Sequence, residues 1–193
     1  MKDLEKIKRL RVVVDMVNGF IKEGALADPE IANIIPGIVE WIEKETKGED
    51  EALALVKDVH EENAAEFKAF PPHCIRGTRE SELVDELKPY EKDALVYEKN
   101  STSVMFAPGF LDDINAMTNL KEVELTGCCT DICILNAAIP LVNYFNQNNR
   151  EVAVNVRTDL IDTFEVPGHS RDEWTAMALK LMKQAGVNLR RDY

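Results

Sequence analysis

The sequence lacks any apolar run of about 18 residues, which is the length that a membrane-spanning helix needs. It also has few cationic residues, because 23 lysines and arginines stand against 35 aspartates and glutamates, for a formal net charge of −12. Such a surface repels nucleic acid and anionic lipid, so we expect neither as a partner. The first residues are too charged for a secretory signal, and we therefore expect a cytoplasmic protein.

Cysteine is scarce as well. The chain has four cysteines in 193 residues, and two of them are adjacent, which argues against the disulfide framework of a small secreted domain. Three of the four lie within eight positions, in the stretch GCCTDICI from Gly127 to Ile134. This clustering raises the question of which thiol, if any, takes part in chemistry.

Strand-like and helix-like segments alternate along the whole chain. We expect strands at 11–17, 51–58, 93–99, 123–127, 151–156 and 187–189, and helices at 36–48, 81–90, 109–117, 130–148 and 170–185. The alternation predicts a single α/β domain over residues 1–193. Its sheet should be doubly wound, mainly parallel and six-stranded, with helices on both faces.

Ligands of such sheets bind just outside the carboxyl ends of the strands. The first expected strand ends at Asp15, the second at Asp58 and His60, and the third at Lys99. The fourth ends at the cysteine cluster. Four consecutive strands therefore deliver chemically capable side chains to one edge of the sheet.

Cys133 is the best placed of the clustered thiols. Thr130 is positioned to cap the helix that follows, which puts Cys133 in a first turn where the helix dipole favours a thiolate. A cation at Lys99 would lower the pKa of that thiol, and a carboxylate at Asp15 can accept its proton. The amides of Cys129 and Cys133 are suited to stabilise an oxyanion. The alternative is that Cys133 is a small buried core residue.

A second group of functional candidates lies in the loop KDVHEENAAEFKAFPPHC, residues 57–74. Asp58 and His60 are two positions apart, so their side chains point the same way in an extended segment. Glu66 and His73 follow in the same loop. Two imidazoles and two carboxylates suit a divalent ion such as zinc, manganese or iron.

Asp15 and Lys99 after their strands, together with T-D-I-C at 130–133, resemble the isochorismatase-like cysteine hydrolases. Within them the chain is most similar to the nicotinamidases, over essentially its whole length. The resemblance implies a catalytic triad of Asp15, Lys99 and Cys133, and a cis peptide bond at Cys128–Cys129. It also implies a homo-oligomer, because members of this family are often dimers or tetramers.

The nicotinamidase resemblance further implies a bound divalent metal ion, with zinc first and iron or manganese as alternatives. Its motifs D-x-H and P-P-H correspond here to Asp58, His60 and His73, and Glu66 would be the fourth ligand. The family also places aromatic side chains around its substrate. In this sequence those positions hold Phe20, Phe70 and Phe106.

The function implied is metal-dependent hydrolysis of nicotinamide to nicotinate and ammonia through a Cys133 thioester, as a step of NAD salvage. One departure concerns the first strand end, where this chain has Val17 and Gly19 in place of the Gln and Asp of the common D-x-Q-x-D-F pattern. An amidase of the same superfamily that acts on another carboxamide or carbamoyl compound is therefore an alternative. A non-catalytic thiol-redox or binding protein that uses Cys128 and Cys129 is a second alternative.

Overall fold

The computed structural model describes residues 3–45 and 48–191. In this part of the chain six strands form one sheet with the order β3-β2-β1-β4-β5-β6, and every neighbouring pair is parallel. The strands are β1 (Arg9–Val14), β2 (Glu51–Asp58), β3 (Leu95–Lys99), β4 (Glu122–Cys128), β5 (Ala153–Asp162) and β6 (Asn188–Arg190). The helices are α1 (Asn18–Ile21), α2 (Ile35–Glu45), α3 (Phe110–Ala116), α4 (Leu135–Gln147) and α5 (Arg171–Gln184). This arrangement confirms the predicted doubly wound α/β fold.

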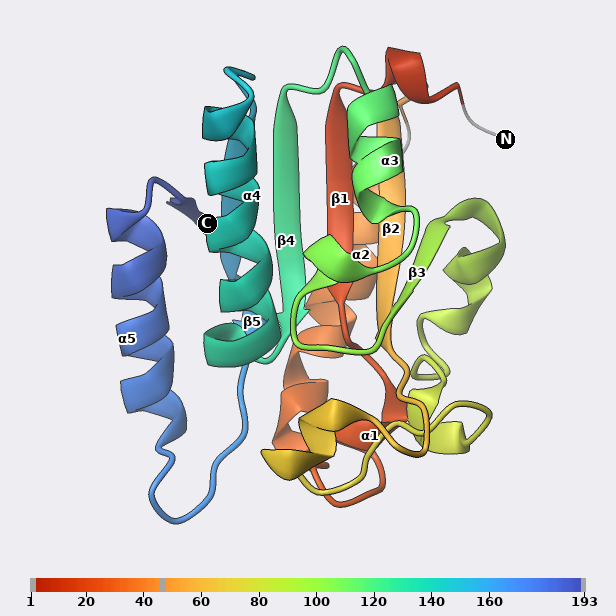
Figure 1. Cartoon of the computed structure of the whole chain (residues 1–193), viewed down its shortest axis with the longest axis vertical. Coiled ribbons are helices and arrows are strands. Elements are labelled where there is room, and N and C mark those ends of the chain that lie inside the picture. Colours follow the sequence, from red (N-terminus) through yellow and green to blue (C-terminus); the bar gives the residue numbers. More distant parts are fainter. Residues whose placement is uncertain (1–2, 46–47, 192–193) are drawn as a thin grey trace.

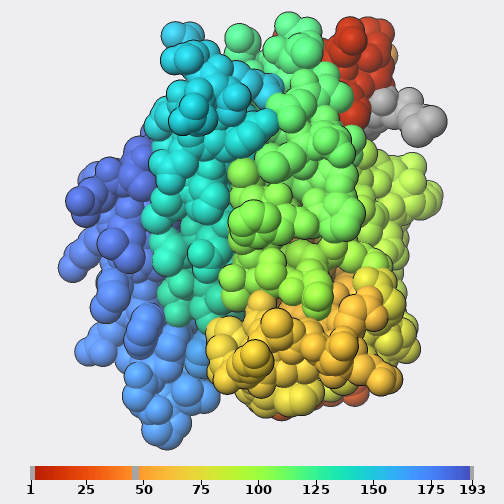
Figure 2. Space-filling view, in the orientation of Figure 1, coloured from red at the N-terminus to blue at the C-terminus, as the bar shows by residue number. Residues whose placement is uncertain are grey.

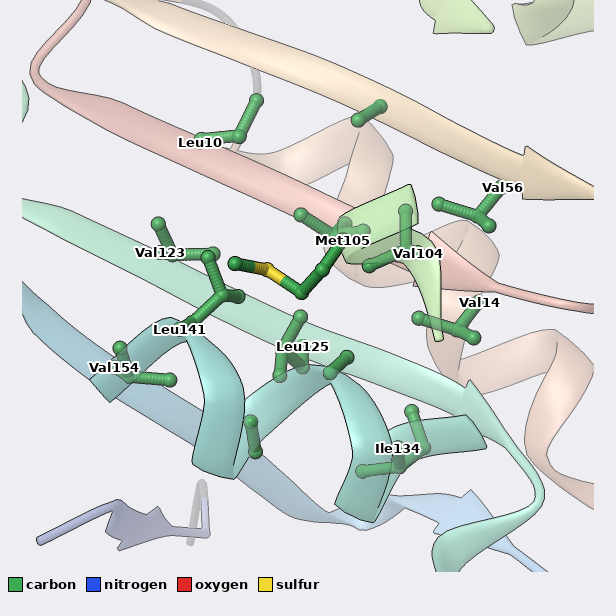
Figure 3. Packing of buried hydrophobic residues seen from close by; sticks show 14 of the residues in the cluster. Leu10, Val14, Val56, Val104, Met105, Val123, Leu125, Ile134, Leu141 and Val154 are labelled. Atoms are coloured by element: carbon green, nitrogen blue, oxygen red, sulfur yellow. The ribbon is translucent and has the colours of Figure 1, made fainter. Parts of the chain in front are cut away.

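Helices cover both faces of the sheet, with α3 and α4 on one side and α2 on the other (Figure 1). Alternate residues of β1 enter the two cores, because successive side chains of a strand point to opposite faces. Leu10, Val12 and Val14 pack with residues of α3 and α4, whereas Val13 packs with residues of α2. Figure 3 shows the first of these cores, in which Met105 lies among side chains from the strands and α4.

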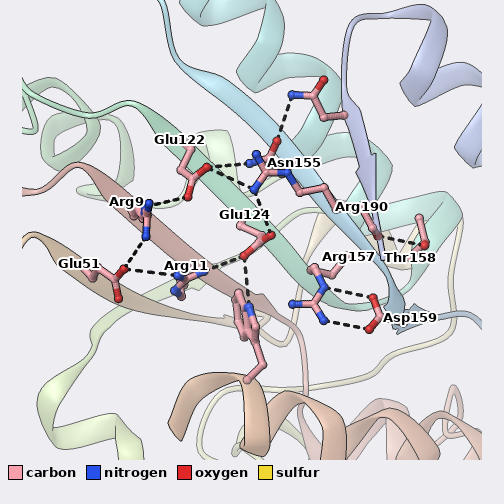
Figure 4. Close-up of polar contacts among 12 residues, drawn as sticks. Arg9, Arg11, Glu51, Glu122, Glu124, Asn155, Arg157, Thr158, Asp159 and Arg190 are labelled. Carbon is pink, nitrogen blue, oxygen red and sulfur yellow. Dashed lines mark hydrogen bonds and ion pairs between the residues drawn. The ribbon is translucent and has the colours of Figure 1, made fainter. Parts of the chain in front are cut away.

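The face of the sheet that α2 covers also carries a cluster of charged side chains on the amino-terminal halves of the strands (Figure 4). Arg11 lies 2.7 Å from Glu124 and 3.5 Å from Glu51, and the Trp41 indole of α2 donates to Glu124 at 3.2 Å. All four side chains are buried. These partners compensate the cost of burying the charges, and the cluster lies at the end of the strands opposite to the candidate site.

The prediction of a helix over residues 81–90 is wrong. Those residues form turns and parts of two short 3₁₀ segments, Arg79–Ser81 and Lys88–Asp93. The backbone of this segment pairs with the chain that follows β1: Asn18 N donates to Glu82 O, and Val84 N donates to Met16 O. The apolar residues that suggested a helix face, Leu83 among them, are buried by this pairing instead.

Other boundaries also differ from expectation. The strand expected over 11–17 is β1, which ends at Val14. β5 continues to Asp162, six residues beyond the predicted end, and so reaches the same edge of the sheet as the candidate site. The helix expected from Thr130 begins with a π-helical turn, Thr130–Ile134, before α4 starts at Leu135. The helix expected over 36–48 is α2, and the part of it at residues 46–47 lies outside the described residues.

Pro140 lies inside α4. A proline has no N–H to donate to the carbonyl four residues earlier, which here belongs to Asn136. The Ser103 hydroxyl donates to that carbonyl oxygen at 2.7 Å. The segment after β3 is thereby hydrogen-bonded to α4. None of the described helices is both long enough and apolar enough to cross a membrane.

Candidate active site

Near the carboxyl ends of β1 and β4, Gly127 pairs with Val14. Gly127 has a φ of 109°, and a Cβ at this position would lie 2.1 Å from the carbonyl oxygen of Val14. Only glycine therefore allows the two backbones to meet here. Directly after this contact, Asp15 adopts a φ of 53°, the Cys128 thiol donates to the Asp15 carbonyl at 3.2 Å, and the Cys128–Cys129 peptide bond is cis, as the family resemblance implies.

Asp15, Lys99 and Cys133 meet at this edge of the sheet. The Lys99 Nζ lies 2.9 Å from Asp15 Oδ2, and the Cys133 side chain is near enough to both residues to affect their pKa values. All three residues are buried, with exposed fractions of 0%, 1% and 6% for Asp15, Lys99 and Cys133. The structure therefore brings together the three residues that the sequence proposed as base, electrostatic partner and nucleophile.

Burial dominates the electrostatics of this group. Desolvation raises the pKa of Asp15 to about 6, although the Lys99 ammonium opposes the rise. The pKa of the Cys133 thiol is also raised, because burial and the carboxylates of Asp15 and Asp58 outweigh the effect of Lys99. Lys99 thus lowers the pKa of the Cys133 thiol, as expected, but burial has the larger and opposite effect. A carboxylate able to accept the thiol proton, that of Asp15, lies in the same group.

Cys133 lies in the π-helical turn that opens α4. Ile134 N donates to Cys129 O at 3.1 Å, five residues back, which is the bond of a π turn. The expected cap by Thr130 is wrong, because its hydroxyl is buried and, among the described residues, has no hydrogen-bond partner. Cys129 and Cys133 both line the cavity beside the sheet edge.

Asp58, His60 and His73 form a second cluster next to the first. One ligand atom from each lies within 4.8 Å of the others, and all three residues are buried. The Nε2 atoms of His60 and His73 lie 2.9 Å and 3.1 Å from the same atom, Asp58 Oδ2. The loop after β2 thus folds back so that His73 reaches the end of the strand.

The other nitrogen of each imidazole fixes its tautomer. His60 Nδ1 donates to Asn100 Oδ1 at 2.9 Å, and His73 Nδ1 donates to the Pro71 carbonyl at 2.8 Å. With protons on Nδ1, each Nε2 presents a lone pair toward a carboxylate oxygen. Three acceptors that converge in this way fit a divalent cation, and imidazoles oriented through Nδ1–H are typical of metal sites.

Glu66, the expected fourth ligand, is less closely placed. Its Oε1 lies 3.8 Å from His60 Nε2, and its side chain is 15% exposed on the rim of the cavity. It belongs to the short 3₁₀ segment Ala65–Lys68, gold in Figure 2, which lies at the end of the molecule where the strands end. Glu66 therefore stays a prediction as a ligand, next to a cluster of three residues that the structure brings together.

Both clusters open onto one cavity of about 530 Å³, a size typical of small-molecule sites. Phe20 and Phe70 line it together with Asp58, His73 and Cys133, as expected. Phe106 was also expected to line the pocket, but it is 80% exposed and is not among the residues that line the cavity in the described chain. Its turn, Val104–Phe106, places Val104 and Met105 in the core and therefore directs Phe106 to the surface.

Several contributors escaped the sequence analysis. Asn100, which orients His60, follows Lys99 directly, so its place at a strand end was a usable signal. The Phe67 ring lies 5.3 Å from the His60 ring between centroids. Phe164 and Arg171 line the cavity from the segment after β5, and they were missed because that strand was expected to end earlier.

Comparison with known proteins identifies relatives of this chain. The chain is 29% identical over 173 residues to an uncharacterized isochorismatase family protein, PncA, of Bacillus subtilis, with 85% of this chain and 91% of the relative covered. It is 32% identical over 139 residues to nicotinamidase 1 of Arabidopsis thaliana, with 65% of this chain and 56% of that protein covered. Thus the match spans little more than half of the plant protein.

The fold also matches solved structures. The pyrazinamidase of Pyrococcus horikoshii, determined in complex with zinc, superposes with a TM-score of 0.79 at 24% identity, over 96% of this chain and 99% of the other. The model of the isochorismatase domain matches residues 10–190, which is nearly the whole chain. The chain therefore belongs to the isochorismatase family of hydrolases.

Proposed function

We propose that this protein is a metal-dependent nicotinamidase, which hydrolyses nicotinamide to nicotinate and ammonia and thereby serves NAD salvage. The observation that carries the proposal is that one cavity is lined both by Cys133 of the buried Asp–Lys–Cys group and by Asp58 and His73 of the cluster of metal-ligand type. The names of the plant nicotinamidase and the archaeal pyrazinamidase support the same substrate class.

The first half of the reaction uses Asp15 as a base. Its raised pKa, about 6, suits a group that must accept a proton near neutral pH and return it later. Asp15 takes the proton from the Cys133 sulfur, and the sulfur attacks the carboxamide carbon. The amides of Cys129 and Cys133 stabilise the oxyanion that forms. Asp15 then protonates the departing nitrogen, so that ammonia leaves and a thioester remains.

The second half releases the acid. Asp15, again a carboxylate, takes a proton from water while the water oxygen attacks the thioester carbon. The carbon–sulfur bond breaks, nicotinate leaves, and the Cys133 thiol regains its proton. Lys99 contacts Asp15 throughout and offsets the negative charge that the buried site carries at each stage.

Asp58, His60 and His73 would hold the divalent ion, with Glu66 as the fourth protein ligand. When bound, the ion supplies a Lewis acid able to hold the ring nitrogen of a pyridine carboxamide. Phe20 and Phe70 supply flat apolar walls for the ring. Asn100 and the Pro71 carbonyl keep both imidazoles in the tautomer that a metal requires.

The test is ammonia release from nicotinamide by purified protein, before and after chelation and after zinc, iron(II) or manganese(II) is added back. We expect turnover that chelation abolishes and a metal restores. Turnover of another carboxamide or of an N-carbamoyl compound, but not of nicotinamide, would overturn the substrate and favour the related amidase. No turnover of any amide, together with equal alkylation of the four cysteines, would favour the non-catalytic alternative.

A further inference from the structure

Three aromatic rings are stacked beside the candidate site. The His169 imidazole lies between Phe164 and Trp174, with centroid distances of 3.9 Å and 4.7 Å and interplanar angles of 9° and 12°. Phe164 lines the cavity, Trp174 belongs to α5, and His169 lies in the loop between them. The orientation of the imidazole plane is therefore fixed from both sides.

The edges of the His169 ring are also engaged. Nδ1 lies 3.0 Å from the Phe164 carbonyl oxygen, and Nε2 lies 2.8 Å from Asp131 Oδ2. The second oxygen of Asp131, Oδ1, accepts from the Thr163 hydroxyl at 2.5 Å. The Asp131 side chain is only 5% exposed. Both of its oxygens are thus held by the segment that follows β5.

Asp131 is the second residue of the π-helical turn Thr130–Ile134, two residues before Cys133. The Thr130 hydroxyl has no partner within the described residues, so it contributes no hydrogen bond to hold this turn. The bonds to Asp131 connect the turn with residues 163 and 169 across more than 30 positions of the sequence. The position of the Cys133 sulfur relative to Asp15 depends on the shape of this turn.

We propose that His169 is a positioning residue for Cys133, which acts through Asp131 and couples the nucleophile's turn to the Phe164 wall of the cavity. The expected effect of His169 on turnover rests on the proposed function. The expected effect of His169 on the reactivity of the Cys133 thiol does not, because a thiol can be alkylated without knowledge of the substrate. The two consequences can therefore be measured separately.

Two substitutions separate hydrogen bonding from stacking. His169→Phe keeps an aromatic ring between Phe164 and Trp174 but removes the donor to Asp131. His169→Gln removes the stacked ring but keeps an amide N–H near the place of Nε2. Loss of a hydrogen bond to a buried carboxylate is costly, so we expect H169F to slow Cys133 alkylation by about tenfold. H169Q should alkylate within about threefold of the wild-type rate, because it keeps a donor.

The experiment measures the rate of iodoacetamide alkylation of the Cys133 peptide by mass spectrometry, together with kcat and KM for nicotinamide. Lys180→Gln, on the exposed part of α5, is the matched control and should alkylate at the wild-type rate. Thr163→Val, which removes the other hydrogen bond to Asp131, should slow alkylation like H169F and serves if H169F does not fold. In turnover, H169F should lower kcat with little change in KM.

A double-mutant cycle shows whether the effect passes through Asp131. In an Asp131→Asn background, H169F should have little further effect on alkylation, because the carboxylate that His169 holds is already gone. Equal or faster alkylation in H169F, or equal slowing by H169F with and without Asp131, would overturn the proposal. If H169F alkylates at the wild-type rate and the wild type hydrolyses nicotinamide, the role of His169 is rejected and the proposed function stands. If H169F alkylates slowly but the wild type does not hydrolyse nicotinamide, the role of His169 stands and the proposed function is rejected.

Discussion

Lys99 joins the two halves of the site through Asp58. Its Nζ lies 2.5 Å from Asp58 Oδ1, while the other oxygen of the same carboxylate faces the imidazoles of His60 and His73. Burial alone would raise the pKa of Asp58, but the Lys99 charge lowers it below its ordinary value. A carboxylate that stays ionised here serves the triad and the metal cluster at once. The two functions are therefore not independent.

Asn100→Ala should weaken metal binding without touching the triad. Asn100 orients His60 through Nδ1, and loss of such a contact commonly costs about 10–100-fold in metal affinity. Competition with a fluorescent zinc chelator measures the affinity. Asn63→Ala, which changes an exposed asparagine in the loop that carries His60 and His73, is the matched control. If N100A binds zinc as tightly as the wild type, the tautomer argument for this cluster fails.

Cys133→Ala should abolish amide hydrolysis, with a loss in kcat of at least about 10³-fold, because the nucleophile is gone. Cys128→Ser is the control, since a hydroxyl can keep the hydrogen bond to the Asp15 carbonyl. Ammonia release measures activity, and thermal unfolding verifies that both variants fold. Appreciable turnover by C133A would reject the thioester mechanism. Inactivity of a folded C128S variant would show that the Cys128 thiol is itself needed for activity.

The pH dependence of kcat/KM should report the ionisation of Asp15. Asp15 acts as a base only when it is ionised, and its pKa is raised to about 6 by burial. Activity should therefore be full above that pH and fall by about tenfold per pH unit below it. The assay needs saturating zinc at each pH, because protons compete for the histidine ligands. Asp15→Asn should show little activity at any pH. A midpoint near 4, the range of an ordinary carboxyl group, would contradict the assignment.

Gly19 marks the departure from the family pattern, and the structure gives a reason for it. A Cβ at this position would lie 2.5 Å from the Cys74 sulfur and 3.1 Å from Glu80 Cβ. Gly19→Ala should thus lower the free energy of unfolding by about 1–3 kcal/mol, as overpacked core positions do. Urea unfolding measures the change.

The matched test of that contact is a double variant. Cys74→Ala removes the sulfur that a new Cβ would meet, so G19A should cost clearly less in the C74A background than in the wild type. An equal cost in both backgrounds would show that the sulfur is not the obstacle. An aspartate at position 19, as in the common family pattern, would require the same space.

The sequence predicted the site better than the elements around it. Asp15, Lys99, Asp58 and the cysteine cluster were found because parallel strands end at one edge, and a strand end can be placed from β-branched runs. Cys133 was chosen over its neighbours by its position in a helix start. The sheet itself followed from the alternation of strands and helices.

Other features depended on tertiary pairing that no local pattern encodes. The apolar spacing of 81–90 fits an amphipathic helix, yet Leu83 and Val84 are buried by backbone pairing with the segment after β1. Phe106 faces away from the cavity because its neighbours Val104 and Met105 fill the core. His169 looked unremarkable in the sequence because its partner Asp131 lies 38 positions away.

Pro140 leaves one backbone carbonyl of α4 free to accept a hydrogen bond from outside the helix. A regular helix keeps all its interior carbonyls for itself, so it offers a neighbouring loop no acceptor. The missing N–H of Pro140 leaves the Asn136 carbonyl open, and Ser103, four residues after Lys99, occupies it. This hydrogen bond therefore joins α4, which follows the turn of Cys133, to the segment that follows Lys99. The backbone hydrogen bond that α4 lacks at Pro140 is thus replaced by a tertiary hydrogen bond between α4 and the segment after β3.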